Sequence, residues 1–105
     1  MAETLIPPVE VAKNAARGLE LRAKHRRGGT SIGVNRARTL SKREHISPET
    51  IKRMVSYFAR HTVDKSAPHF EDDDDPSAGK IAWLLWGGDA GEKWAADVKR
   101  RLSGN

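Results

Sequence analysis

The segment PSAGKIAWLLWGGDAGEKWA, residues 76–95, decides the fold because it contains all three tryptophans of the chain. The run AWLLW at residues 82–86 is apolar on every side, which is typical of a helix that is buried all round. We predict that this helix starts near Ser77 and ends at Gly87-Gly88, since glycine tolerates the left-handed backbone of a helix end. The residues expected to be buried are Ile81, Ala82, Leu84 and Leu85.

The tryptophans of this segment have two interpretations. Trp83 and Trp86 are three residues apart and share one side of a helix, while Trp94 can pack back on them across the glycine turn. A core aromatic cluster is the favoured interpretation, because each buried tryptophan removes a large apolar area from water. The alternative is a stacking platform for a base or for a partner's side chain.

A further helix is expected directly after the glycines. Asp89 is placed to cap it, because an aspartate side chain accepts hydrogen bonds from the free amides of a first turn. The apolar positions of this helix are Trp94, Ala95, Val98 and Leu102. The short connection favours a helical hairpin at the C-terminal end of the domain.

Upstream, residues 47–61 (SPETIKRMVSYFARH) form the clearest predicted helix of the chain. Ser47 supplies an N-cap, Pro48 fits the first helical position, and Glu49 places a negative charge at the positive helix end. The face expected to be buried consists of Ile51, Met54, Val55 and Phe58.

Two more helices precede this one. The first follows Pro7-Pro8 and ends near His25, and its apolar face consists of Ala12, Ala15, Ala16 and Leu19. Gly18 costs that helix about 1 kcal/mol relative to alanine unless a neighbour packs closely there. After a break at residues 26–29, Thr30 or Ser31 caps a short helix whose apolar side is Val34, Ala37 and Leu40.

Together these segments predict an all-α protein. We expect a small single domain of four to five short helices over residues 1–105, with its core between about residues 8 and 102. Hydrophobic residues make up 37% of the chain, which allows a thin helical core but no large enzyme cleft. Residues 66–76 hold a run of five carboxylates between Pro68 and Pro76, so we expect an exposed, mobile acidic loop.

Several classes of function are disfavoured by what the sequence lacks. There is no cysteine, so neither disulfides nor thiolate metal sites are expected. No apolar run reaches the length of a membrane span, and no phosphate-binding loop, dinucleotide fingerprint or nucleophile elbow occurs. We therefore expect no membrane association, enzyme, cofactor or metal. His61 and His69 beside Asp72–Asp75 are interpreted as part of a solvated loop, and a metal-dependent nuclease is the least favoured alternative.

The net charge of +5 is unevenly distributed. Residues 1–65 contain fourteen Lys/Arg and six Asp/Glu, a balance of +8, whereas residues 66–105 carry −3. Basic side chains around a Gly-Gly-Thr turn favour a nucleic-acid partner, DNA in the first place, held through its phosphates and largely independently of base sequence. The predicted contact residues are Arg26, Arg27, Gly28, Gly29, Thr30, Arg36, Arg38, Lys42, Arg43, Lys52 and Arg53.

The sequence leaves other interpretations of the charges open. The basic residues can instead keep a solvated surface, or form internal ion pairs such as Arg60 or Lys65 with Asp64 or Asp89. The acidic loop can fold over the basic face and tune its affinity for nucleic acid, or it can simply aid solubility.

Several strings of the chain also stand out together. They are RGLELR at residues 17–22, RGGT at 27–30 followed by Gly33-Val34 and Arg36-Ala37, SPETIKRMVSYFARH at 47–61, VDK at 63–65, and the segment at 76–95. With these strings the chain resembles, over about residues 8–95, a small module of unassigned role that recurs in bacteriophages and prophages, alone or joined to head-maturation and other phage proteins. The resemblance implies a phage setting in the cytoplasm of the host cell, with virion association as a second location, and brings no catalytic activity with it.

The alternative function is a protein–protein interaction module in phage assembly or in modulation of a host protein. It would use an exposed part of the tryptophan segment or the acidic loop. The exposure of the tryptophans discriminates between the two functions. Three buried rings and a continuous positive face favour nucleic acid, whereas an exposed apolar patch with internally paired basic residues favours a protein partner.

Overall fold

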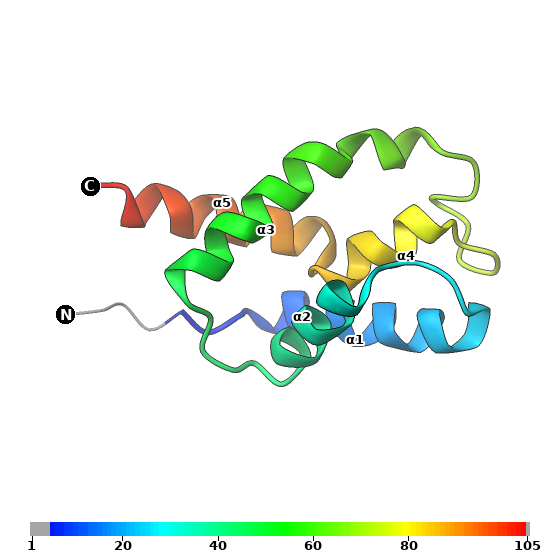
Figure 1. Ribbon diagram of the computed structural model, residues 1–105, viewed down its shortest axis with the longest axis horizontal. Coiled ribbons are helices and arrows are strands. Elements are labelled where there is room, and N and C mark those ends of the chain that lie inside the picture. The colour runs from blue at the N-terminus through cyan, green and yellow to red at the C-terminus, as the bar shows by residue number, and fades with distance from the viewer. Residues whose placement is uncertain (1–4, 105) are drawn as a thin grey trace.

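Five α-helices and one short 3₁₀ helix, with no strand, make up the part of the chain that the computed structural model describes, residues 5–104 (Figure 1). Their bounds are α1 Val9–His25, α2 Ser31–Ser41, α3 Pro48–His61, η1 Thr62–Ser66, α4 Ala78–Leu85 and α5 Gly88–Leu102. The predicted all-α class is therefore confirmed. The helix η1, which continues directly from α3, was not predicted.

Side-chain caps start three of the helices where the sequence predicted them. The Oγ of Ser47 accepts a hydrogen bond from the amide of Thr50 at 3.1 Å, and that of Ser77 accepts one from Lys80 at 3.1 Å. Of the two cap candidates for α2, Thr30 takes the role. Each cap satisfies an amide that the first helical turn leaves without an intrahelical partner.

The prediction that Asp89 caps α5 is wrong. This helix starts at Gly88, so Asp89 already lies inside it, and Gly87 is the N-cap residue with a φ of 110°. The Asp89 carboxylate instead accepts a hydrogen bond from the indole N–H of Trp83 at 2.9 Å and contacts the Nζ of Lys65 at 2.9 Å. The second contact is one of the internal ion pairs anticipated from the sequence.

Close packing of α1 on α4 explains the glycine inside α1. A Cβ on Gly18 would lie 2.7 Å from the amide nitrogen of Leu85, so no larger residue fits between the two helices. This contact outweighs the low helix propensity of glycine. The buried face of α1 is rotated from the predicted one, because Ala16 is exposed and Leu19 only half-buried, while the fully buried positions are Val11, Ala12, Ala15, Gly18 and Leu21.

The core is built around the aromatic rings. Trp83 is 1% exposed and Trp86 9%, as the core interpretation predicts, while Trp94 is only partly buried against the same cluster. Three apolar residues of the two C-terminal helices are more exposed than predicted: Ala82, Leu84 and Leu102. At the other end of the chain the core begins before residue 8. Leu5 is 2% exposed, and its carbonyl accepts the amide of Ile46 at 2.8 Å.

The glycine turn between α4 and α5 joins helices that pack mainly on different partners. α4 lies chiefly against α1, and α5 lies chiefly against α3 (Figure 1). The turn expected of a hairpin is present, but contact between α4 and α5 themselves is limited. This arrangement leaves one side of α4 facing the space between α2 and α3.

The acidic loop is exposed, as predicted, but it is anchored at both ends. Phe70 is 3% exposed and packs edge-on against Trp83, with 6.2 Å between the ring centroids. Near the other end, Asp75 pairs with Arg27 at 3.0 Å. Phe70 was not predicted to be a core residue.

Candidate anion-binding groove

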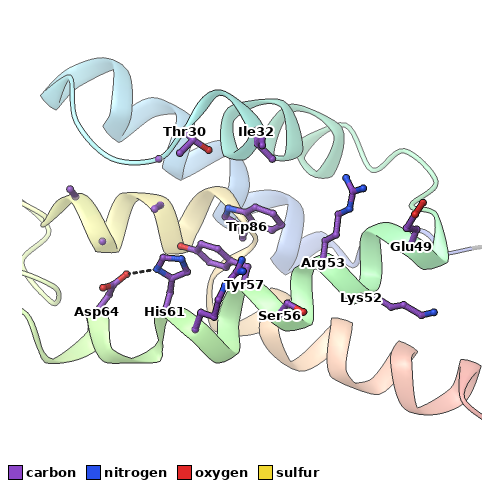
Figure 2. Close-up of a pocket in the computed structure, with 15 residues that line it drawn as sticks. Thr30, Ile32, Glu49, Lys52, Arg53, Ser56, Tyr57, His61, Asp64 and Trp86 are labelled. Carbon is purple, nitrogen blue, oxygen red and sulfur yellow. Dashed lines mark hydrogen bonds and ion pairs between the residues drawn. The ribbon is translucent and has the colours of Figure 1, made fainter.

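A groove of about 940 Å³ lies between α2 and α3, with α4 as its floor (Figure 2). Among residues 5–104, α2 and α3 make no direct packing contact, so the groove separates them. We call this space the α2–α3 groove. The residues that line it include Gly29, Thr30, Ile32, Lys52, Arg53, Tyr57, Arg60, His61, Ala82 and Trp86.

The largest contribution to the wall comes from one stripe of α3. Its members recur at intervals of three and four residues, which places them on one side of a helix. They are Glu49, Lys52, Arg53, Ser56, Tyr57, Arg60 and His61. The stripe is basic at three positions and aromatic at two, and it runs beside the buried apolar face of the same helix.

Beneath the cations the rings form a continuous stack. Trp86 lies parallel to Tyr57, with 4.5 Å between centroids and 6° between planes. His61 stacks on Tyr57 at 4.4 Å, and its Nδ1 lies 3.1 Å from the carboxylate of Asp64. Arg36 of α2 places its guanidinium carbon 5.4 Å from the Trp86 ring centroid. The stack therefore connects α2, the end of α4, α3 and η1.

Arg36 and Arg53 give the groove its electrostatic character. Burial, followed by the positive charge of Arg53, lowers the pKa of the Arg36 guanidinium from its ordinary value. The Nε of Arg36 is buried without a hydrogen-bond partner, and within residues 5–104 neither arginine forms an ion pair with a carboxylate. The positive charge of Arg53 therefore acts on Arg36 without a counter-charge, and an anion that contacts both side chains would relieve this repulsion.

Tyr57 is a second unusual group in the wall. Burial, followed by the nearby carboxylate of Asp64, raises the pKa of its hydroxyl, which therefore stays protonated at neutral pH. The residue is 5% exposed, and within the described chain its hydroxyl has no hydrogen-bond partner. A buried hydroxyl without a partner costs about 1–3 kcal/mol.

The structure brings some of the predicted contact residues together and places others elsewhere. Gly29, Thr30, Lys52 and Arg53 line the α2–α3 groove, and Arg36 adjoins it. The predicted residues outside the lining are Arg26, Arg27, Gly28, Arg38, Lys42 and Arg43. The predicted set therefore separates into a groove group and a remainder.

Part of that remainder has structural partners. Arg27 pairs with Asp75 and donates to the carbonyl of Pro76 at 3.2 Å, while the Nε of Arg43 donates to the carbonyl of Pro7 at 2.8 Å. Gly28 has a φ of 91°, and a Cβ there would lie 2.7 Å from that of Ile81, so this glycine lets the loop approach α4. Arg27 and Gly28 thus position the turn before α2, whereas Arg43 joins the segment after α2 to Pro7.

Several lining residues were absent from the predicted contact set, namely Ile32, Tyr57, Arg60 and His61. A signal for three of them exists in the sequence, because residues 53, 57, 60 and 61 have the spacing of one helix face. The apolar face of the same helix, which lies next to this stripe, is the stronger periodic pattern in the sequence. Ile32 carries no such signal, since its role depends on where α2 lies relative to α3.

No group of three or more potential metal ligands occurs among the side chains of residues 5–104. None of the helices in that range combines the length and the apolar character needed to cross a membrane. The chain matches no protein-family model, and no curated protein or solved structure is detectably similar to it. The geometry of the α2–α3 groove is therefore the basis for a functional proposal.

Proposed function

We propose that this protein binds nucleic acid, mainly through phosphate contacts made by the cations of the α2–α3 groove. The observation that carries the proposal is the pair formed by Arg36 and Arg53. The two guanidiniums come from different helices, repel each other, and have no acidic partner in the described chain. A phosphate between them would remove this repulsion, and guanidinium matches phosphate geometry well.

The surroundings of this pair support the same ligand. Lys52 and Arg60 extend the positive charge along α3 on either side of Arg53, and Thr30 opens α2 at the rim of the groove. The positive end of the α2 dipole also favours a nearby anion. Trp83 and Trp86 are buried and Trp94 is partly buried against the same cluster, so two of the three rings are withdrawn from a protein partner. The resemblance to a phage-associated module adds the biological setting that we propose.

A titration of fluorescently labelled DNA, single-stranded and duplex, at two salt concentrations tests the proposal. We expect binding at low salt that weakens steeply as salt rises, because bound phosphates release counterions. Arg53→Gln should reduce the slope of log affinity against log salt by about 1. The matched control is Arg17→Gln, which removes the same charge from an exposed residue of α1 that is paired with Glu20.

Two results would overturn this proposal. One is the absence of binding to either DNA at low salt. The other is an equal loss of affinity in Arg53→Gln and Arg17→Gln, which would reduce the interaction to net charge alone. Binding of an acidic protein partner under conditions where DNA does not bind would support the interaction-module alternative instead.

A further inference from the structure

The α2–α3 groove has an apolar part that phosphate contacts do not explain. Ile32 lies on its rim and is 61% exposed, the highest value for a large hydrophobic residue in the α-helices of the described chain. Opposite it, the residues of α4 that line the groove are all small: Ala78, Gly79 and Ala82. Figure 2 shows Ile32 on the α2 side and Tyr57 and Trp86 deeper in the groove. An occupant of this space gains by burying apolar surface there.

The size and the polar groups of the groove narrow the choice of occupant. Its volume of about 940 Å³ is at the upper end of the range for small-molecule sites. The hydroxyl of Tyr57 in its wall and the Nε of Arg36 above Trp86 are both buried without partners in residues 5–104. A suitable occupant is therefore flat or apolar in one part, carries hydrogen-bonding groups at an edge, and is anionic in another part.

We propose that the α2–α3 groove takes one unpaired nucleotide of a single strand, with its base between Ile32 and Ala82 and its phosphate at Arg36 and Arg53. This inference rests on the proposed function and specifies the form of nucleic acid. A base in a duplex is stacked and paired, so it cannot enter a groove without leaving the helix, at a cost of a few kcal/mol. An unpaired base avoids that cost. The protein thus prefers single strands to duplexes.

The arrangement of the groove favours a nucleotide over a segment of protein. Glu49 and Asp64 in the same wall repel the carboxylates of an acidic peptide and a phosphate alike, so the choice depends on how each occupant combines its charge with a flat group. Each nucleotide carries one negative charge on its phosphate, and the sugar sets the distance from that phosphate to a flat base. This matches a groove in which the paired arginines lie beside an apolar space.

The experiment compares three labelled DNAs that carry the same number of phosphates per strand: a single strand, the same strand with abasic sites, and the duplex. At low salt we expect the single strand to bind at least about fivefold more tightly than the abasic strand, since base contacts contribute where phosphates cannot. Ile32→Ala should abolish most of this preference. Val63→Ala is the matched control, because Val63 is 74% exposed and lies outside the groove.

The outcomes separate this inference from the proposed function. Equal affinity for the normal and the abasic strand, with no effect of Ile32→Ala, overturns the nucleotide site and leaves phosphate binding standing. Failure of all three DNAs to bind at low salt overturns both. If a labelled polyglutamate peptide binds and the DNAs do not, the groove serves a protein partner and the nucleotide site is overturned. Circular dichroism of each variant verifies that the helices are intact.

Discussion

Two regions of this molecule hold cations in opposite circumstances. In the loop region, formed by η1 and residues 67–77, carboxylates or cations are paired: Lys65 contacts Asp89 at 2.9 Å, and Asp75 contacts Arg27 at 3.0 Å. At the α2–α3 groove, Arg53 in the wall and Arg36 beside it repel each other and have no carboxylate partner in the described chain. Lys65, Arg27, Arg36 and Arg53 all count alike toward the balance of +8 in residues 1–65, and only their pairing distinguishes them.

The two regions differ in whether their cations are available to a ligand. A cation with a carboxylate partner has part of its field neutralised, and exposed pairs of this kind contribute little to stability. Two unpaired cations close together raise the energy of the folded state. An anion that binds to both lowers that energy again. We therefore expect substitutions of the groove cations to change binding, and substitutions of the paired cations to change binding much less and stability only slightly.

The largest contrast concerns two apolar side chains, Phe70 of the loop region and Ile32 of the groove. Phe70→Ala should lower the free energy of unfolding by about 3–5 kcal/mol, because it leaves a cavity against Trp83. Ile32→Ala should change it by less than about 0.5 kcal/mol, since that side chain is mostly exposed. Urea unfolding followed by tryptophan fluorescence measures both. Similar losses in the two variants would contradict the division of roles.

The second contrast concerns arginines. The double variant Arg36→Met and Arg53→Gln should weaken DNA binding at low salt by about tenfold or more, and lower the salt slope by about 2, because two phosphate contacts are lost. Its free energy of unfolding should change little, since the loss of the repulsion between the two arginines offsets the loss of the Arg36 contact with the Trp86 ring. Fluorescence anisotropy and urea unfolding of the same preparation measure the two effects.

Arg27→Gln is the comparison for this double variant. Arg27 lies outside the groove and loses only its contacts with Asp75 and Pro76, so stability should fall by up to about 0.5 kcal/mol. Its DNA affinity should decrease less than that of the groove variant. If Arg27→Gln weakens binding as strongly as the double variant, the groove is not the main contact surface.

The third prediction concerns Asp89 and its dependence on pH. The hydrogen bond from Lys65, and then that from Trp83, lower the pKa of its carboxyl, although burial opposes the shift. Because the folded pKa lies below the unfolded value of about 3.9, the stabilisation is complete above that value and is lost as the pH falls through the folded pKa. Asp89→Ala should cost about 1 kcal/mol at pH 7, mainly because the buried indole N–H of Trp83 loses its acceptor.

Urea unfolding at pH 7 and at several values below 4 measures this effect. The loss of stability in acid should become smaller in Asp89→Ala but should not vanish. Asp72, whose pKa is lowered first by the hydrogen bond with His69, contributes in the same direction. An unchanged acid dependence in the variant would show that Asp89 does not contribute to the stability of this region.

Local chemistry made the helices predictable. Ser47, Ser77 and Thr30 cap their helices because a hydroxyl can reach an amide three residues on, which depends on nothing beyond that turn. The burial of Trp83 and Trp86 follows from their size and spacing. Neither conclusion needs a tertiary arrangement.

The groove was less predictable because tertiary packing creates it. α1 holds α2 and α4 on its surface, α5 holds α3, and the space between α2 and α3 results from both. Nothing near Ile32 in the sequence indicates that separation. In the same way, Asp89 seemed suited to cap a helix, but its partners Lys65 and Trp83 come from other elements. Of the predicted contact residues, those bordering the groove were found from charge, and the aromatic stack beside them was not.

The smallest expected effect tests whether an ion pair by itself prevents a cation from binding the nucleic acid. Asp75→Asn removes the partner of Arg27, and Asp73→Asn removes the same charge from the same loop without breaking an ion pair among the described residues. Both variants raise the positive potential slightly, so their DNA affinities should rise at low salt and converge with the original at high salt. The DNA affinity of Asp75→Asn should exceed that of Asp73→Asn by less than about twofold. The reason is that Arg27 lies outside the groove and gives at most a peripheral contact. A tenfold gain in Asp75→Asn alone would contradict this, because the acidic loop would then be competing directly with the nucleic acid.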